Sequence, residues 1–291
     1  MMLAAAFLWG ISFVTQRLAA LAMNGMPFTF NAARYLIGAV ILAPFVMRAG
    51  ALRSRATWIG GGAAGCAMIA GSTLQQAAMN AVSAGTAGFI TSTYVVWVPL
   101  LGLIWGQRVG VRVWIGVALA VAGLWLLCGG GDFALSRAEF MLLGCAFAWG
   151  FHVQIIGWAA TRGDVFGIAF VQFLVTAVAS SAGALTFEPL SVEVVLGAAG
   201  PILFAGVFSI AVAFTLQIVG QSAAPPAHAA IIMSLESVFA ELAGSVWMNE
   251  GFGARKWFGG LLILGGALLA TVIGPRQHPR EDPRPREAEA D

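Results

Sequence analysis

Long apolar stretches follow one another along this chain, separated by loops of only a few residues. A helix needs about 20 apolar residues to cross the hydrocarbon core of a bilayer. Ten such stretches take up nearly all of the 291 residues and leave no loop long enough for a soluble domain. The predicted spans are residues 2–20, 28–47, 57–79, 84–106, 112–129, 138–160, 165–187, 194–219, 226–248 and 254–273. The sequence therefore predicts an all-α membrane protein of ten transmembrane helices, with the lipid bilayer as a partner.

The composition agrees with a bilayer environment. Hydrophobic residues make up 59% of the chain and charged residues 10%, against about 25% charged in soluble domains. The net charge of +2 is scattered over loops, so no nucleic-acid partner is expected. Cys66, Cys128 and Cys145 lie far apart without metal-ligand spacing, so neither a metal nor another cofactor is expected. Residues 274–291, rich in proline, arginine and acidic residues, are predicted to be a disordered cytoplasmic tail.

Basic residues indicate how the chain is oriented in the membrane. With the N-terminus inside, the even-numbered loops and the tail carry ten of the 15 Lys and Arg residues, and the outer loops carry three. The other two, Arg17 and Arg34, lie within spans. Cytoplasmic loops are generally enriched in Lys and Arg. We therefore expect a multi-pass plasma-membrane protein, of the bacterial inner-membrane kind, with both termini cytoplasmic.

Sequence matches between the two halves of the chain indicate a duplication. Residues 7–10 (Phe-Leu-Trp-Gly) match residues 147–150 (Phe-Ala-Trp-Gly) at an offset of 140. Residues 73–75 recur at 215–217, at an offset of 142. Further pairs at 142 and 143 extend the match through the fourth and fifth spans of each half. Each half holds five spans, an odd number, so the second half is expected to enter the membrane inverted.

This duplication predicts a function. Inverted repeats, here 1–135 and 136–273, with a shared site near the midplane, characterise secondary transporters. We therefore predict an exporter of small metabolites that works by alternating access, and not an enzyme. An intramembrane enzyme is the alternative from another class, but the sequence has no His-Glu-x-x-His or Gly-x-Ser-x-Gly motif. A retinal-based light sensor would need an intramembrane lysine, whereas the single lysine, Lys256, is predicted to lie in a loop.

Two stretches resemble a known family. Residues 27–44, with Arg34 and Tyr35 early in the helix, resemble the start of the repeat in the EamA-type branch of the drug/metabolite transporter superfamily. Residues 235–240 (Leu-Glu-Ser-Val-Phe-Ala), with 249–250 (Asn-Glu) at the end of the segment, resemble the most recognisable motif of that family. The resemblance covers nearly the whole chain except the tail. It implies the ten-helix, inverted-repeat fold and a transport function.

The chain also departs from the family pattern. Ser237 stands where a proline is usual, and Tyr94 and Gln107 replace the two glutamates in the first half. Residues 94–99, together with Trp149, look most like the YddG-type aromatic amino-acid exporters. That likeness implies an amino-acid substrate. Other small organic compounds or drugs are the alternative substrates.

Glu236 lies near the middle of the ninth span, where a charged side chain is costly unless it faces protein or water. It can be the partner of a substrate ammonium group or a proton-coupling group. The alternative is a neutral, hydrogen-bonded structural acid, and the sequence does not decide between these roles. Glu241 is five residues further on, about 140° round the helix, so it cannot face the same site and is expected to be structural.

Amide side chains recur at matching places in the two halves. Gln75 and Gln217 are related by the repeat, and Gln76 belongs to a polar stripe on the third span. We expect Gln75 or Gln76 to line the substrate pathway. The alternative is hydrogen bonding between helices, which membrane bundles use routinely.

Three tryptophans, Trp9, Trp97 and Trp149, lie deep within spans instead of at the membrane interface where tryptophan is usual. An aromatic wall with a few amides suits an aromatic or sulfur-containing side chain of a zwitterion. We expect Trp97 to be the principal wall, because it lies beside Tyr94 and before a helix break at Pro99. Packing between helices is the alternative for each tryptophan.

Two other polar residues are candidates. His152 can titrate near neutral pH, although a neutral hydrogen-bonding role is favoured for a lone intramembrane histidine. Arg34 can contact a substrate carboxylate, but snorkelling of its guanidinium to the outer surface is favoured. The predicted substrate-binding set is therefore Trp97, Tyr94, Trp149, Gln75, Gln76, Trp9, His152, Gln217 and Glu236, with proton coupling left open.

Overall fold

The computed structural model describes residues 1–128, 136–249, 251 and 253–272. Within these ranges every regular element is a helix, as the sequence predicts. The predicted tail at 274–291 lies outside the described residues.

Within residues 1–128 the first half contains six helices. They are α1 (Met2–Ala22), α2 (Pro27–Ala49), α3 (Arg55–Ala78), α4 (Ala84–Ser92), α5 (Tyr94–Ile104) and α6 (Val111–Cys128). The second half contains eight further α-helices and one π-helix. They are α7 (Arg137–Ala159), α8 (Val165–Phe187), α9 (Val192–Gly197), α10 (Ala199–Phe204), the π-helix η1 (Ala205–Phe214), α11 (Thr215–Gln221), α12 (Pro226–Met233), α13 (Glu236–Trp247) and α14 (Ala254–Val272).

Seven helices or consecutive helix groups in the described residues are long and apolar enough to cross a membrane. They are Met2–Ala22, Pro27–Ala49, Ala84–Ile104, Arg137–Ala159, Val165–Phe187, Ala199–Gln221 and Pro226–Trp247. Large apolar side chains such as Val40, Met47 and Leu185 are mostly exposed along these helices. A soluble protein would bury such side chains, and a bilayer accepts them. The chain is therefore a multi-pass, helical membrane protein.

Two of the predicted spans are broken near their middle. The fourth divides into α4 and α5 at Thr93, and the ninth divides into α12 and α13 at Ser234 and Leu235. The Thr93 hydroxyl donates to the Ile90 carbonyl (2.6 Å), and the Ser234 hydroxyl donates to the Ile231 carbonyl (2.8 Å). Such side-chain bonds compete with the regular helical pattern. Thr93 and Leu235 differ by 142, which is the offset of the sequence repeat.

The predicted break at Pro99 is wrong, because Pro99 lies inside α5. The missing proline N–H removes only one hydrogen bond, and neighbouring helices support the backbone there. The hydroxyl-bonded turn at Thr93 interrupts the span six residues earlier.

The eighth span also differs from its prediction. It starts at Ala199 instead of residue 194, because Val192–Gly197 forms the separate helix α9. The backbone turns at Ala198 (φ −102°, ψ 10°), and Pro201, in the first turn of α10, has no N–H to donate. The middle of this span is the π-helix η1, an uncommon conformation that occurs frequently at functional sites.

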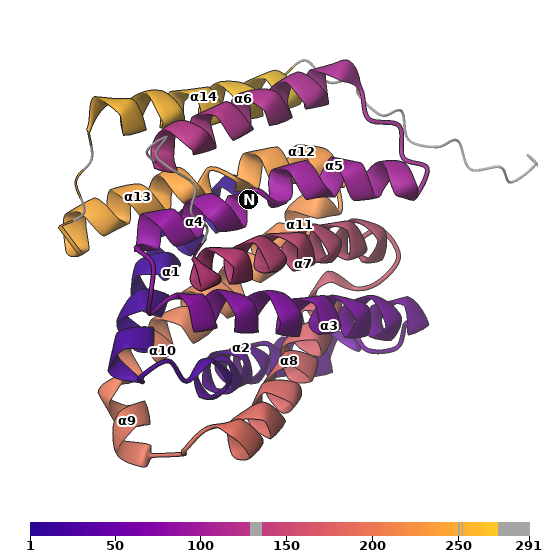
Figure 1. The fold of residues 1–291 in the computed structure, drawn as a ribbon. Coiled ribbons are helices and arrows are strands. Elements are labelled where there is room, and N and C mark those ends of the chain that lie inside the picture. The colour runs from indigo at the N-terminus through magenta and orange to yellow at the C-terminus, as the bar shows by residue number, and fades with distance from the viewer. Residues whose placement is uncertain (129–135, 250, 252, 273–291) are drawn as a thin grey trace, which may run out of the picture.

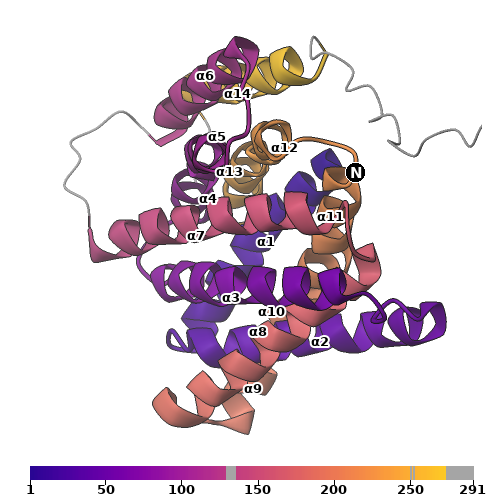
Figure 2. The ribbon, with the colours of Figure 1, turned by 90° about the vertical axis from the view of Figure 1, so that its right-hand side faces the viewer.

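Helices from the two halves are interleaved in the bundle. Figure 1 shows α6 and α14 side by side at one end, the broken pairs α4/α5 and α12/α13 beneath them, and α7, α3, α2 and α8 beyond. Figure 2 shows the same order from the side. Close packing depends on small residues: a side chain at Gly10 would collide with Phe239, so α1 can approach α13 only because residue 10 is glycine.

Candidate functional site

A cavity with about 510 Å³ of empty space lies among the helices. Its walls come from α1, α2, α3, α4, α5, α7, η1, α11, α12 and α13, and therefore from both halves of the chain.

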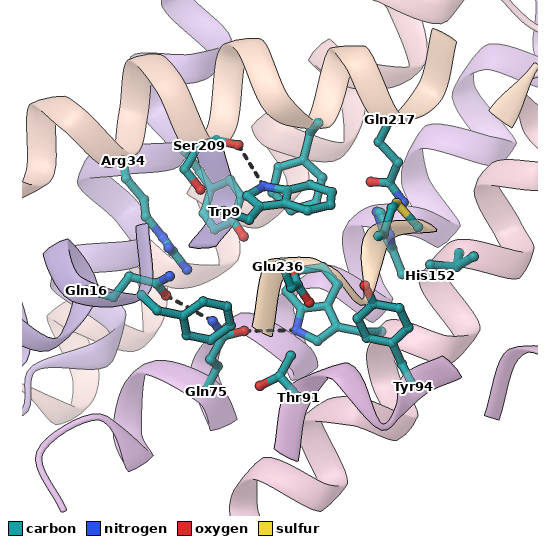
Figure 3. Close-up of a pocket in the computed structure, with 16 residues that line it drawn as sticks. Trp9, Gln16, Arg34, Gln75, Thr91, Tyr94, His152, Ser209, Gln217 and Glu236 are labelled. Carbon is teal, nitrogen blue, oxygen red and sulfur yellow. Dashed lines mark hydrogen bonds between the residues drawn. The ribbon is translucent and has the colours of Figure 1, made fainter. Parts of the chain in front are cut away.

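Aromatic rings form one wall of this cavity (Figure 3). The Trp149 ring stacks on Phe214 with centroids 5.7 Å apart and 30° between the planes, and Trp9 lies 4.8 Å from Phe214. The Trp9 indole N–H donates to the Ser209 carbonyl at 3.2 Å. Ser209 and Phe214 both belong to η1, so the π-helix fixes the position of the aromatic wall.

A chain of amides links three helices at the cavity (Figure 3). The Trp149 indole N–H donates to Gln75 Oε1 (3.0 Å), and Gln75 Nε2 donates to Gln16 Oε1 (3.3 Å). These bonds connect α7 through α3 to α1. Gln76 donates from its own Nε2 to the Gln16 backbone carbonyl (3.0 Å) and is not part of the lining. Gln75 therefore faces the cavity, while Gln76 holds α3 against α1.

The break between α12 and α13 places Glu236 in the cavity, as the first residue of α13. Its side chain is buried, and Oε1 accepts a 3.4 Å hydrogen bond from the Ser92 hydroxyl at the end of α4. A helix N-terminus favours negative charge. Tyr94 is the first residue of α5 and lines the same cavity, so the residues related by the repeat each begin a half-helix there.

Arg34 also lines the cavity, and its side chain reaches into it in Figure 3. The residue is only 3% exposed. The expectation that its guanidinium reaches the outer surface is therefore wrong. Contacts of α2 with η1 and α8 enclose this part of α2, and the guanidinium instead lies 4.9 Å from the Phe30 ring and 5.0 Å from the Tyr35 ring.

His152 and Gln217 also contribute polar groups to the lining. His152 Nε2 and Gln172 Oε1 are 2.9 Å apart, which agrees with a neutral hydrogen-bonding histidine. Gln217 Nε2 donates to Gln221 Oε1 (2.8 Å). His152 Nδ1 and Gln217 Oε1 have no hydrogen-bond partner in the part of the chain that the structure describes. Both atoms are therefore available to a ligand if the side chains shift slightly.

Trp97 does not line the cavity. The prediction that it forms the principal wall is therefore wrong. It is 36% exposed, and its ring packs edge-on against Phe147 at 5.1 Å. Residues three apart are offset by about 60° round a helix. With Tyr94 facing inward, Trp97 consequently turns toward α7 and the outer surface.

Glu241 lies away from the cavity, as its spacing from Glu236 predicts. Its carboxylate forms an ion pair with Lys256 near the start of α14, and it also lies against Gly85 at the start of α4. These contacts tie α13 to its neighbours and agree with a structural role.

Several lining residues escaped the sequence analysis as site residues. Gln16 shares a helix face with Trp9, so its spacing is a usable signal. Phe13 and Met233 look like ordinary core residues in the sequence. Ser209 and Phe214 carry no signal, because their facing depends on the π-helical pitch of η1.

Comparison with known proteins places this cavity in a transporter. The model of the EamA-like transporter family matches residues 1–129 and 136–272. The chain belongs to the EamA-like transporter family. It is a membrane transporter of small compounds, and transporters of this kind are generally not enzymes.

Relatives agree with this family assignment. The chain is 30% identical over 269 residues to an "Uncharacterized transporter" of Archaeoglobus fulgidus, covering 92% of this chain and 82% of the relative. A solved structure named "Crystal structure of protein" shares the fold, with a TM-score of 0.71 at 20% identity. That match covers 92% of this chain and 96% of the other.

Proposed function

We propose that this member of the family is a secondary transporter that exports amino acids, by alternating access of the cavity between two inverted five-helix halves. The observation that carries the proposal is the cavity itself, which both halves line. It combines aromatic walls with amides and one buried carboxyl group. A molecule with an apolar side chain and an ammonium group matches that combination.

Helix packing supports an inverted duplication, with residues 1–135 and 136–273 as the halves. A two-fold relation exchanges α1, α2, α3, α4/α5 and α6 with α7, α8, the span containing η1, α12/α13 and α14. Under this relation, the packing of α3 against α7 should be matched by packing of η1 against α1. The packing of α3 against α8 should likewise be matched by packing of η1 against α2. Both of these matching contacts exist. Likewise, α1 packs on α13 and α7 packs on α5. The two largest remaining contacts, α6 with α14 and α2 with α8, each join a helix to its own counterpart in the other half.

The paired breaks support a mechanism of alternating access. Half-helices joined at Thr93 and at Ser234–Leu235 can change direction at the turn without melting the whole span. Transporters commonly place discontinuous helices around their substrate site. The π-helix η1 supplies a third irregular segment, which lies against the aromatic wall.

The lining residues that the sequence predicted have proposed roles in substrate binding. Trp9, Trp149 and Tyr94 contact the substrate side chain, and Glu236 pairs with the ammonium group. Gln75, His152 and Gln217 supply hydrogen bonds to the polar part. Gln76 positions α3 and does not touch the substrate, and Trp97 is left outside the site.

Direction and energy source are part of the same proposal. The basic loops favour cytoplasmic termini in the plasma membrane, so export moves substrate away from the side of the termini. Glu236 is the residue that can exchange a proton, because it lies in the cavity through which the substrate passes. Exchange of substrate for a proton is therefore the proposed coupling.

Transport into proteoliposomes tests this function. Purified protein is reconstituted, and counterflow of radiolabelled phenylalanine, methionine, leucine and threonine is measured at several pH values against protein-free liposomes. Saturable counterflow that other amino acids inhibit is the expected result. If amino acids fail to compete while another class of small compound is transported, the amino-acid part of the proposal is wrong.

A further inference from the structure

We infer that Arg34 is the carboxylate-recognition residue of the cavity, so that the transporter requires a carboxylate on its substrate and rejects the corresponding amine. The inference rests on the proposed function and makes it more specific. It concerns one residue and one chemical group, and it is independent of which side chain the substrate carries.

The first observation is that Arg34 is a buried cation without an anionic partner. The side chain is 3% exposed, and no carboxylate of the described residues forms an ion pair with it. Arginine keeps its charge in proteins. A buried charge is costly unless an opposite charge or hydrogen bonds compensate it. An anionic ligand in the adjoining cavity would supply that compensation.

The second observation is how the guanidinium is held. Its Nε–H donates to Asn31 Oδ1 at 3.0 Å, one turn earlier on α2. The rings of Phe30 and Tyr35 lie beside it at 4.9 and 5.0 Å. The structure gives its two Nη groups no protein hydrogen bond among the described residues. The Nη groups of an arginine can bind both oxygens of a carboxylate.

The third observation is that the cavity holds an opposite group separately. Glu236, from the start of α13, lines the same space without pairing with Arg34 (Figure 3). One site thus presents an anion receptor and an acid at different places. A zwitterion can span them, with its carboxylate on Arg34 and its ammonium group on Glu236.

Matched compounds separate these contacts. Binding of phenylalanine, 3-phenylpropanoate and 2-phenylethylamine is measured by calorimetry in detergent, and transport by counterflow in proteoliposomes. A second set is leucine, 4-methylpentanoate and 3-methylbutylamine. We expect each amine to bind about tenfold to hundredfold more weakly than its amino acid, because it lacks a charge-assisted hydrogen bond.

Two variants of the site and one control test the residue. Arg34→Gln should abolish the preference for the amino acid over the amine. Asn31→Asp should also largely remove this preference, because it places an internal carboxylate beside Arg34 Nε with little change of shape. This second variant keeps the test valid if Arg34→Gln fails to fold. Arg17→Gln is the control, because Arg17 lies on α1 outside the cavity and bonds to the Met79 carbonyl (3.4 Å).

The outcomes distinguish the two proposals. Equal binding of amine and amino acid by the wild type, or an unchanged preference in both site variants, would overturn the role of Arg34. If amines are transported as well as amino acids, the amino-acid transport proposal stands and the role of Arg34 fails. If folded wild-type protein binds none of the six compounds, both the role of Arg34 and the amino-acid proposal fail.

Discussion

The hydrogen bond between Trp149 and Gln75 offers a quantitative test of how rigidly the cavity is built. Trp149→Phe keeps an aromatic ring against Phe214 but leaves Gln75 Oε1 with only the Cys145 thiol, 3.6 Å away. Gln75→Leu removes partners from both the Trp149 indole N–H and Gln16 Oε1. A buried polar group left without a partner costs about 1–3 kcal/mol. We therefore expect about 1–3 kcal/mol for the first change and about 2–4 kcal/mol for the second.

The double variant shows whether the costs of the two single changes are additive. Once Trp149 is phenylalanine, Gln75→Leu leaves only Gln16 Oε1 without its partner. One unpartnered group costs about 1–3 kcal/mol, so the two changes should cost about 2–4 kcal/mol less together than the sum of the single changes. At about 2–4 °C per kcal/mol, this corresponds to a melting temperature about 4–16 °C above the additive value.

The assay is thermal unfolding of the wild type, the two single variants and the double variant, all in the same detergent at one concentration. Size-exclusion chromatography measures the fraction of folded protein that remains after heating. Trp97→Phe is the control, because Trp97 lies outside the amide chain, and its effect should add to that of Gln75→Leu. Additive melting temperatures for Trp149→Phe and Gln75→Leu would refute the idea that the amide chain fixes the aromatic wall.

Three further predictions concern other parts of the protein. Glu236→Gln should weaken but not abolish counterflow, because its neutral amide can only hydrogen-bond the ammonium group, and it should abolish dependence on a pH gradient. Arg34, Tyr94 and His152 face the same cavity. Wild-type transport that is indifferent to pH would remove the coupling role of Glu236. Glu188→Ala should lower the melting temperature by several degrees, because Glu188 accepts bonds of 2.7–2.8 Å from the first turn of α2; an unchanged value would contradict this. Trp9→Ala should reduce transport of bulky amino acids more than small ones, while Trp97→Ala should not discriminate, which counterflow of phenylalanine and threonine measures.

Much of the fold was predictable because its causes are local. Apolar length sets which segments cross the bilayer, and turn residues such as Gly25 and Gly50, both with positive φ, mark helix ends. The irregular elements were harder to predict. The break at Thr93 depends on a hydroxyl that bonds a carbonyl three residues earlier, and threonine also occurs inside unbroken helices. The π-helix of η1 depends on its neighbours, which the sequence does not state.

The same difference between local causes and packing with neighbours explains which cavity residues could be predicted. Trp9, Trp149, Gln75 and Glu236 line the cavity, and they were chosen as candidates because polar or indole groups deep in an apolar span are unusual. Trp97 satisfied that rule equally well, yet a difference of about 60° round α5 placed it outside the cavity. The break at the start of α5 decides which face of this helix turns inward. Helical periodicity predicts relative positions within one helix, but not how a helix is rotated after a break.

The proposed inverted repeat would pair cavity residues of unequal charge, and this would affect how a substrate binds. α2 begins at Pro27 and α8 at Val165, an offset of 138, which pairs Arg34 with Gln172. Gln172 is neutral and bonds to His152, so the second half has no counterpart of the buried cation. Glu236 likewise has Tyr94 as its counterpart. Related backbones can let either half move, but only one orientation of a zwitterion pairs with both charges, and the substrate should therefore keep that orientation throughout the transport cycle.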